Sequence, residues 1–122
     1  MAEEKDDLEF EIEFFESIAE QNPDYHECMM ALGNAYTLKG DYHRGLEIDQ
    51  RLAEIRPRDK LVFYNLACSL SLLQRLDDAF DALERAIELG YLDYDYMLKD
   101  DDLANLRRDP RFPQIILSHF QE

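Results

Sequence analysis

The chain has 122 residues, of which 28 are acidic and 13 basic, so its formal net charge is −15. A chain of this length is expected to form one domain over residues 1–122, and 46% hydrophobic residues with only four glycines and four prolines predict an ordered, mostly helical fold. The negative charge disfavours nucleic acids and anionic membranes as partners, and it favours neutral or basic proteins.

The two cysteines, Cys28 and Cys68, show no metal-ligand spacing, so we expect them to be buried, reduced thiols. The acidic N-terminal residues lack the apolar core of a secretory signal. No apolar run approaches the length that spans a bilayer. These features predict a cytoplasmic protein.

The first predicted helix covers residues 8–21, where apolar residues recur at helical spacing and glutamates occupy most of the other positions. Phe10, Phe14 and Phe15 widen its apolar surface. Such a helix is expected either to be contacted on more than one side or to take part in self-association.

The next stretch contains Leu32-Gly33-Asn34-Ala35-Tyr36, then Gly40-Asp41-Tyr42 and finally Pro57. It predicts two helices, over about residues 24–39 and 41–56, with Asp24 and Asp41 as N-caps and Gly40 as the stop between them.

A second copy follows thirty-four residues later, with Leu66-Ala67 in place of Leu32-Gly33 and with Asp77 as the expected cap of its second helix. After Gly90 the period fails. Asp100 falls opposite Leu66 and is therefore not expected in a core. The remainder predicts two short helical turns and a final helix from Pro110 or Phe112 onward.

A thirty-four-residue period built from two helices is typical of the tetratricopeptide repeat, and residues 8–91 resemble that family. The resemblance implies an all-α, right-handed solenoid of antiparallel helix pairs. In this scheme 8–23 is a half-repeat helix, 24–57 and 58–91 are two repeats, and 92–122 is an irregular helical cap like the segment that closes bacterial arrays.

Members of the family are mostly non-catalytic and bind peptides in a concave groove that is lined by the first helix of each repeat. Carried over to this chain, the groove residues are Glu27, Met30, Asn34, Thr37, Leu38, Leu61, Tyr64, Asn65, Cys68 and Leu72.

Asn34 and Asn65 are the candidates for holding a peptide backbone, because an amide both donates and accepts hydrogen bonds. The alternative is that both are solvated polar residues. The family's clamp for acidic peptides is not expected, since Met30 stands where that clamp has a lysine.

Met30, Leu61, Tyr64 and Leu72 could anchor apolar side chains of a partner. The alternative is that the tail, or another copy of the protein, covers them. Both interpretations are open at the level of sequence.

No pattern of catalytic or metal-binding residues emerges, so we expect no enzyme, no metal and no cofactor. The aspartates between residues 93 and 102 lack the spacing of a calcium loop. The expected function is a protein-binding adaptor or small chaperone. The alternative is a scaffold, such as a homodimer, that assembles through Phe10, Phe14 and Phe15.

Overall fold

A computed structural model of the protein describes residues 2–120, and the side chains of residues 7–120. Every regular element in this part of the chain is a helix, and consecutive helices pack in pairs. The chain divides after Pro57 into two compact units, Met1–Pro57 and Arg58–Glu122. The expected all-α fold with paired helices is confirmed.

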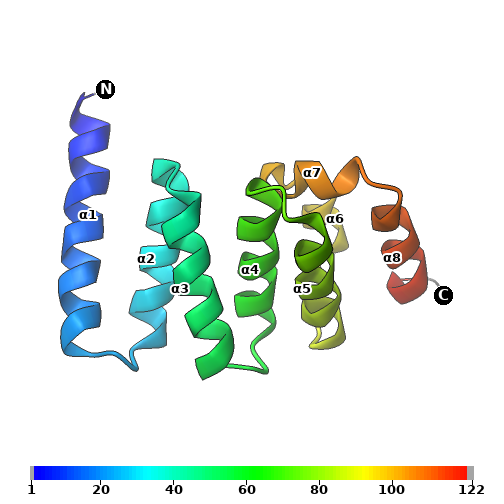
Figure 1. The fold of residues 1–122 in the computed structure, drawn as a ribbon, viewed down its shortest axis with the longest axis horizontal. Helices are drawn as coiled ribbons and strands as arrows, with labels where there is room; N and C mark the ends of the chain where they lie inside the picture. The colour runs from blue at the N-terminus through cyan, green and yellow to red at the C-terminus, as the bar shows by residue number, and fades with distance from the viewer. Residues whose placement is uncertain (1, 121–122) are drawn as a thin grey trace. The chain divides into compact units, whose positions relative to one another are not determined.

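The first unit contains α1 (Ala2–Gln21), α2 (His26–Lys39) and α3 (Tyr42–Ile55). The middle helix, α2, packs against both of its neighbours, as Figure 1 shows. The long α1 therefore packs on the first helix of the α2–α3 pair.

A left-handed glycine ends α2, and an aspartate cap begins α3. Gly40 has a φ of 91°, and its N–H donates to the Thr37 carbonyl, so the turn uses the left-handed conformation that glycine adopts freely. The Asp41 side chain accepts a 3.2 Å hydrogen bond from the Arg44 N–H, which confirms the predicted cap. The predicted Asp24 cap is wrong, because Tyr25 occupies the N-cap position.

One core cluster of the first unit joins α1 to α2. Its buried members are Ile12, Leu32, Ala35 and Tyr36, and the partly buried residues that pack on them are Leu8, Phe15, Ala19 and Ile48. Helices approach closely at Gly33, where an added Cβ would lie 3.2 Å from the Ile48 Cγ2 atom. A side chain at this position would have to displace Ile48.

The second unit begins with the pair α4 (Lys60–Leu72) and α5 (Leu76–Glu88). Asp59 caps α4 by accepting hydrogen bonds from the Leu61 and Val62 N–H groups. Asp77 lies in the first turn of α5, and Arg75 takes the N-cap position, so the predicted Asp77 cap is wrong.

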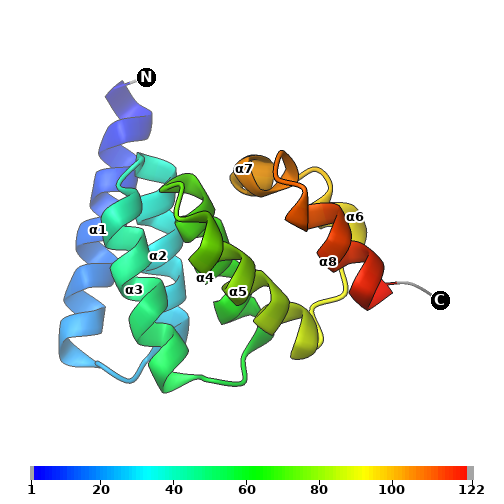
Figure 2. The same cartoon turned by 45° about the vertical axis from the view of Figure 1, so that its right-hand side comes forward.

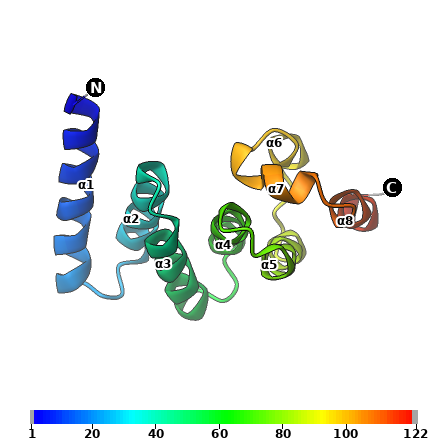
Figure 3. The ribbon, with the colours of Figure 1, turned by 45° about the horizontal axis from the view of Figure 1, so that its top comes forward.

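The C-terminal segment of this unit comprises α6 (Tyr94–Met97), the 3-10 turn η1 (Asp101–Leu103), α7 (Ala104–Arg107) and α8 (Arg111–Phe120). The two short helical turns and the final helix match the prediction. Figures 2 and 3 show this segment alongside the α4–α5 pair. Its contacts are with α4 through η1 and α7, and with α5 through α7 and α8.

Among the residues that the structure describes, no helix combines the length and the apolar character needed to cross a membrane.

Candidate functional site

One face of α2 in the first unit carries the first five predicted groove residues. Glu27, Asn34 and Leu38 are exposed, whereas Met30 and Thr37 are partly buried. Leu38 is 79% exposed. This face lies opposite the core-facing residues of the same helix.

The polar groups on the α2 face differ in how they are satisfied. The Thr37 hydroxyl donates a 3.1 Å hydrogen bond to the Gly33 carbonyl within the helix. The Asn34 amide has no such bond to another described residue. Asn34 therefore keeps both its donor and its acceptor capacity on an open surface.

The equivalent face of α4 in the second unit is covered. Tyr64 and Cys68 are 4% and 7% exposed, so the prediction that they line an open groove is wrong. The cover is the chain's own C-terminal segment, which was the alternative that the sequence left open. Leu61 stays exposed at one end of the helix, and Asn65 and Leu72 are partly buried.

Aromatic stacking and hydrogen bonds hold this cover in place. The Tyr64 ring stacks on that of Tyr91, with centroids 4.1 Å apart, and its hydroxyl donates a 2.5 Å hydrogen bond to the Asp100 Oδ2 atom. Further along α4, the Asn105 side-chain amide donates a 2.8 Å hydrogen bond to the Ser71 carbonyl. These contacts join α4 to Tyr91, which follows α5, and to Asp100 and Asn105 of the C-terminal segment.

Asp100 is buried, contrary to its expected exclusion from the core. A buried carboxylate must be satisfied by hydrogen bonds. Its Oδ2 accepts from Tyr64, and its Oδ1 accepts a 3.0 Å bond from the Asp102 N–H. The repeat period could not reveal this, because the partners come from outside the repeat.

Burial also perturbs the acidity of the neighbouring groups. It raises the pKa of the Tyr64 phenol well above its usual range and that of Tyr91 to about 12. Burial, reinforced by the charges of Asp100 and Asp101, raises the pKa of the Asp102 carboxyl. Relative to the unfolded chain, folding shifts each of these groups toward its uncharged form.

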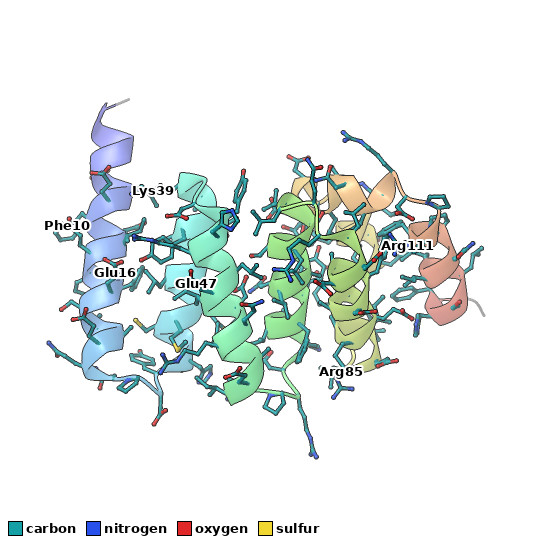
Figure 4. All side chains as sticks on the ribbon, in the orientation of Figure 1. Phe10, Glu16, Lys39, Glu47, Arg85 and Arg111 are labelled. Carbon is teal, nitrogen blue, oxygen red and sulfur yellow. The ribbon has the colours of Figure 1, made fainter. Side chains whose placement is uncertain are left out.

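The predicted self-association residues on α1 separate into two environments. Phe10 and Phe14 are 67% and 54% exposed, and their rings are nearly parallel with centroids 6.5 Å apart. Figure 4 shows Phe10 projecting away from α2. Phe15 instead packs on the core of the first unit, so its inclusion in an exposed association surface is wrong.

The first unit also has a hollow that the sequence did not indicate. Two adjoining pockets of about 480 and 500 Å³ lie between α1 and α3, and they share Glu16, Ile48 and Arg51. We call them the α1–α3 trough. Its other lining residues are Ala19, Glu20, Pro23, Met29, Leu32, Tyr36, Arg44 and Glu47.

The described residues show no arrangement suited to metal binding, since no group of three or more His, Cys, Asp or Glu side chains converges. Cys28 and Cys68 are both buried and are not joined by a disulfide, as expected. Burial raises the pKa of the Cys28 thiol, whose Sγ lies 3.4 Å from the Phe15 carbonyl. A thiol in this state is a poor nucleophile.

No protein-family model matches the chain. The chain is similar to a chloroplastic protein from Arabidopsis thaliana, with 30% identity over 93 residues. The matched region covers 74% of this chain but 28% of the Arabidopsis protein. The chain therefore spans a minor part of that protein's length.

Proposed function

We propose that this chain is a non-catalytic, tetratricopeptide-like interaction module that binds a peptide or client protein, as an adaptor or small chaperone. The binding surface is the α2 face of the first unit. Its residues are Glu27, Met30, Asn34, Thr37 and Leu38.

The observation that carries this proposal is the occupied state of the equivalent α4 face. Tyr64 and Cys68 stand thirty-four residues after Met30 and Asn34, and they hold a segment of the chain's own tail. The same face of a repeat helix thus serves as a polypeptide-binding surface within this chain. On α2 that face is exposed and polar groups remain available.

The chemistry of the α2 face suits a backbone-reading site with an apolar anchor. Met30 is flexible and polarisable and Leu38 protrudes, so both can pack on partner side chains. Between them Asn34 can donate to a backbone carbonyl and accept from a backbone N–H. The nearby Glu27 and the net charge of −15 favour a neutral or basic partner.

Affinity capture from a lysate of the source organism tests the proposal. The bait is the wild-type chain or a Met30→Ala/Asn34→Ala/Leu38→Ala variant. The matched control carries three truncations of exposed α3 residues, His43→Ala/Gln50→Ala/Glu54→Ala. We expect a client that the wild type and the control retain and the α2 variant loses. Identical retention by all three baits would refute α2 as the binding face.

A second candidate function is self-assembly through α1, favoured by the exposed, stacked pair Phe10 and Phe14. Acidic residues surround this pair, so two α1 helices repel one another and salt should strengthen their association. Sedimentation at several protein concentrations, for the wild type and Phe10→Glu, measures it. Constant monomer mass at high salt would exclude assembly.

A further inference from the structure

The walls of the α1–α3 trough carry different charges. Along α1, Glu9, Glu13, Glu16 and Glu20 follow one another at intervals of four, three and four residues, which aligns them on a single side of the helix. Glu16 and Glu20 from this row line the trough. The charged residues that α1 contributes to the trough are therefore all acidic.

The opposite wall belongs to α3 and carries Arg44, Glu47 and Arg51. Figure 4 labels Glu16 and Glu47 on the two walls. Between the walls, the floor is apolar, since Met29, Leu32 and Ile48 line it. The trough therefore has an apolar floor, an acidic α1 side and an α3 side that carries both signs of charge.

Some of these charges already have partners within the first unit. The Tyr36 hydroxyl donates a hydrogen bond to Glu16, and Arg44 lies over the Tyr36 ring and 3.6 Å from an Asp41 oxygen. Burial and the Glu16 contact raise the pKa of Tyr36, so the phenol remains a donor. By contrast, Glu20 and Arg51 make no ion pair with any residue in the described range.

We propose that the trough binds an amphipathic helix of a partner protein that carries lysines or arginines on one flank. Its apolar stripe would rest on Met29, Leu32 and Ile48. Its basic flank would face the glutamate row of α1, and an acidic residue on the other flank would pair with Arg51.

The dimensions of the trough fit this occupant. Arg44 and Arg51 are seven residues apart on α3, which corresponds to about 10 Å along the helix axis, or two turns. A helix in a groove presents apolar anchors over the same length, at positions i, i+3 or i+4, and i+7. An acidic wall also disfavours a second copy of this acidic chain as the occupant.

The trough and the α2 binding face present different residues of the first unit. Met30, Asn34 and Leu38 are absent from the trough lining. The two surfaces can therefore bind different partners, and either binding proposal can be refuted while the other holds.

The test uses a synthetic helical peptide of about 14 residues, or four turns. The peptide has leucines at i, i+3, i+4 and i+7, lysines on one flank and glutamates on the other, and fluorescence anisotropy measures its binding. The test variant is Glu13→Lys/Glu20→Lys. The control is Asp7→Lys/Glu11→Lys, which makes the same charge change on the other side of α1.

We expect the test variant to weaken binding by about tenfold or more, and the control by less than about twofold. Equal losses in both variants would mean general electrostatic attraction and would overturn the proposal. So would a wild-type Kd weaker than about 1 mM. Peptide binding that is lost in the Met30→Ala/Asn34→Ala/Leu38→Ala variant would place the peptide on α2 and also overturn it.

Discussion

The Tyr64 hydroxyl and the Asp100 carboxylate form a 2.5 Å hydrogen bond across thirty-six residues of sequence, and both residues are buried. This bond ties the first helix of the second repeat to the segment that follows the repeats. Because the segment lies on α4, the second unit offers no open counterpart of the α2 face. The two sequence copies share one repeat pattern, but this face of the first helix is covered in the second copy and exposed in the first.

Replacing Tyr64 with phenylalanine removes the hydroxyl and leaves the ring to stack on Tyr91. The Oδ2 atom of Asp100 then loses a buried donor, so we expect the second unit to lose about 1–3 kcal/mol of unfolding free energy. Urea unfolding followed by circular dichroism measures this loss. The matched control is Tyr96→Phe, because Tyr96 is 47% exposed. Equal midpoints for the two variants would show that the hydroxyl contributes nothing.

Alkaline pH is expected to destabilise the second unit. Tyrosines in an unfolded chain ionise near pH 10, whereas burial raises the pKa of Tyr91 to about 12 and that of Tyr64 well above its usual range. The contribution of these two tyrosines to stability is therefore fully present below about pH 10. Above it, the unfolded state loses protons that the folded state keeps, so stability falls by up to about 1.4 kcal/mol per pH unit for each tyrosine.

Urea unfolding at a series of pH values from 9 to about 12 measures this slope. The Tyr64→Phe/Tyr91→Phe variant should show a smaller slope over the same range. A stability that is flat through pH 11, or an unchanged slope in the double variant, would contradict the assignment to these two tyrosines.

Arg111 joins α8 to α5, as Figure 4 shows. It donates hydrogen bonds of 2.9 and 3.1 Å to Asp109 and one of 2.6 Å to the Asp77 Oδ1 atom, and its guanidinium carbon lies 4.5 Å from the centroid of the Phe80 ring. The guanidinium also holds the pKa of Asp109 below its usual range. Arg111→Ala should therefore release α8.

Hydrogen exchange measures this release as lost amide protection in α8 with protection retained in α4 and α5. Arg111→Lys should give an intermediate result, because an ammonium keeps the charge but lacks the planar fork. The control is Arg108→Ala, since Arg108 is exposed. Uniform loss of protection across the whole second unit would argue against a local role for Arg111.

Gly33 is expected to tolerate alanine but not valine. The added Cβ would meet Ile48 at 3.2 Å and the Asp49 Oδ1 atom at 3.3 Å, but Ile48 borders the α1–α3 trough and has room to shift. Replacing a helical glycine with alanine also gains about 1 kcal/mol of propensity. We expect Gly33→Ala to change stability by less than about 1 kcal/mol and Gly33→Val to cost about 2 kcal/mol or more.

Thermal unfolding of the two variants measures the difference. The second repeat supports the alanine prediction, because Ala67 occupies the equivalent position and is fully buried. A large loss on Gly33→Ala would mean that Ile48 cannot move.

The helices were predictable from sequence because their signals are local. Apolar residues at helical spacing, the Asp41 cap and the left-handed glycine at position 40 all act within a few residues of one another. The caps of α2 and α5 differ from the prediction. Tyr25 and Arg75 hold these N-cap positions without a side-chain cap bond, although an aspartate stands nearby in each case. The presence of each helix was therefore easier to predict than the residue at which it begins.

The sequence by itself determined the helix pairs and the repeat period, because those depend on the spacing of apolar residues and on contacts between neighbouring helices. Only the tertiary structure decided that Tyr64, Cys68 and Asp100 are buried together. Tyr64 and Met30 occupy equivalent positions, and nothing in either repeat says which face is covered. The covering segment lies outside the repeats, and its long-range contacts follow no period.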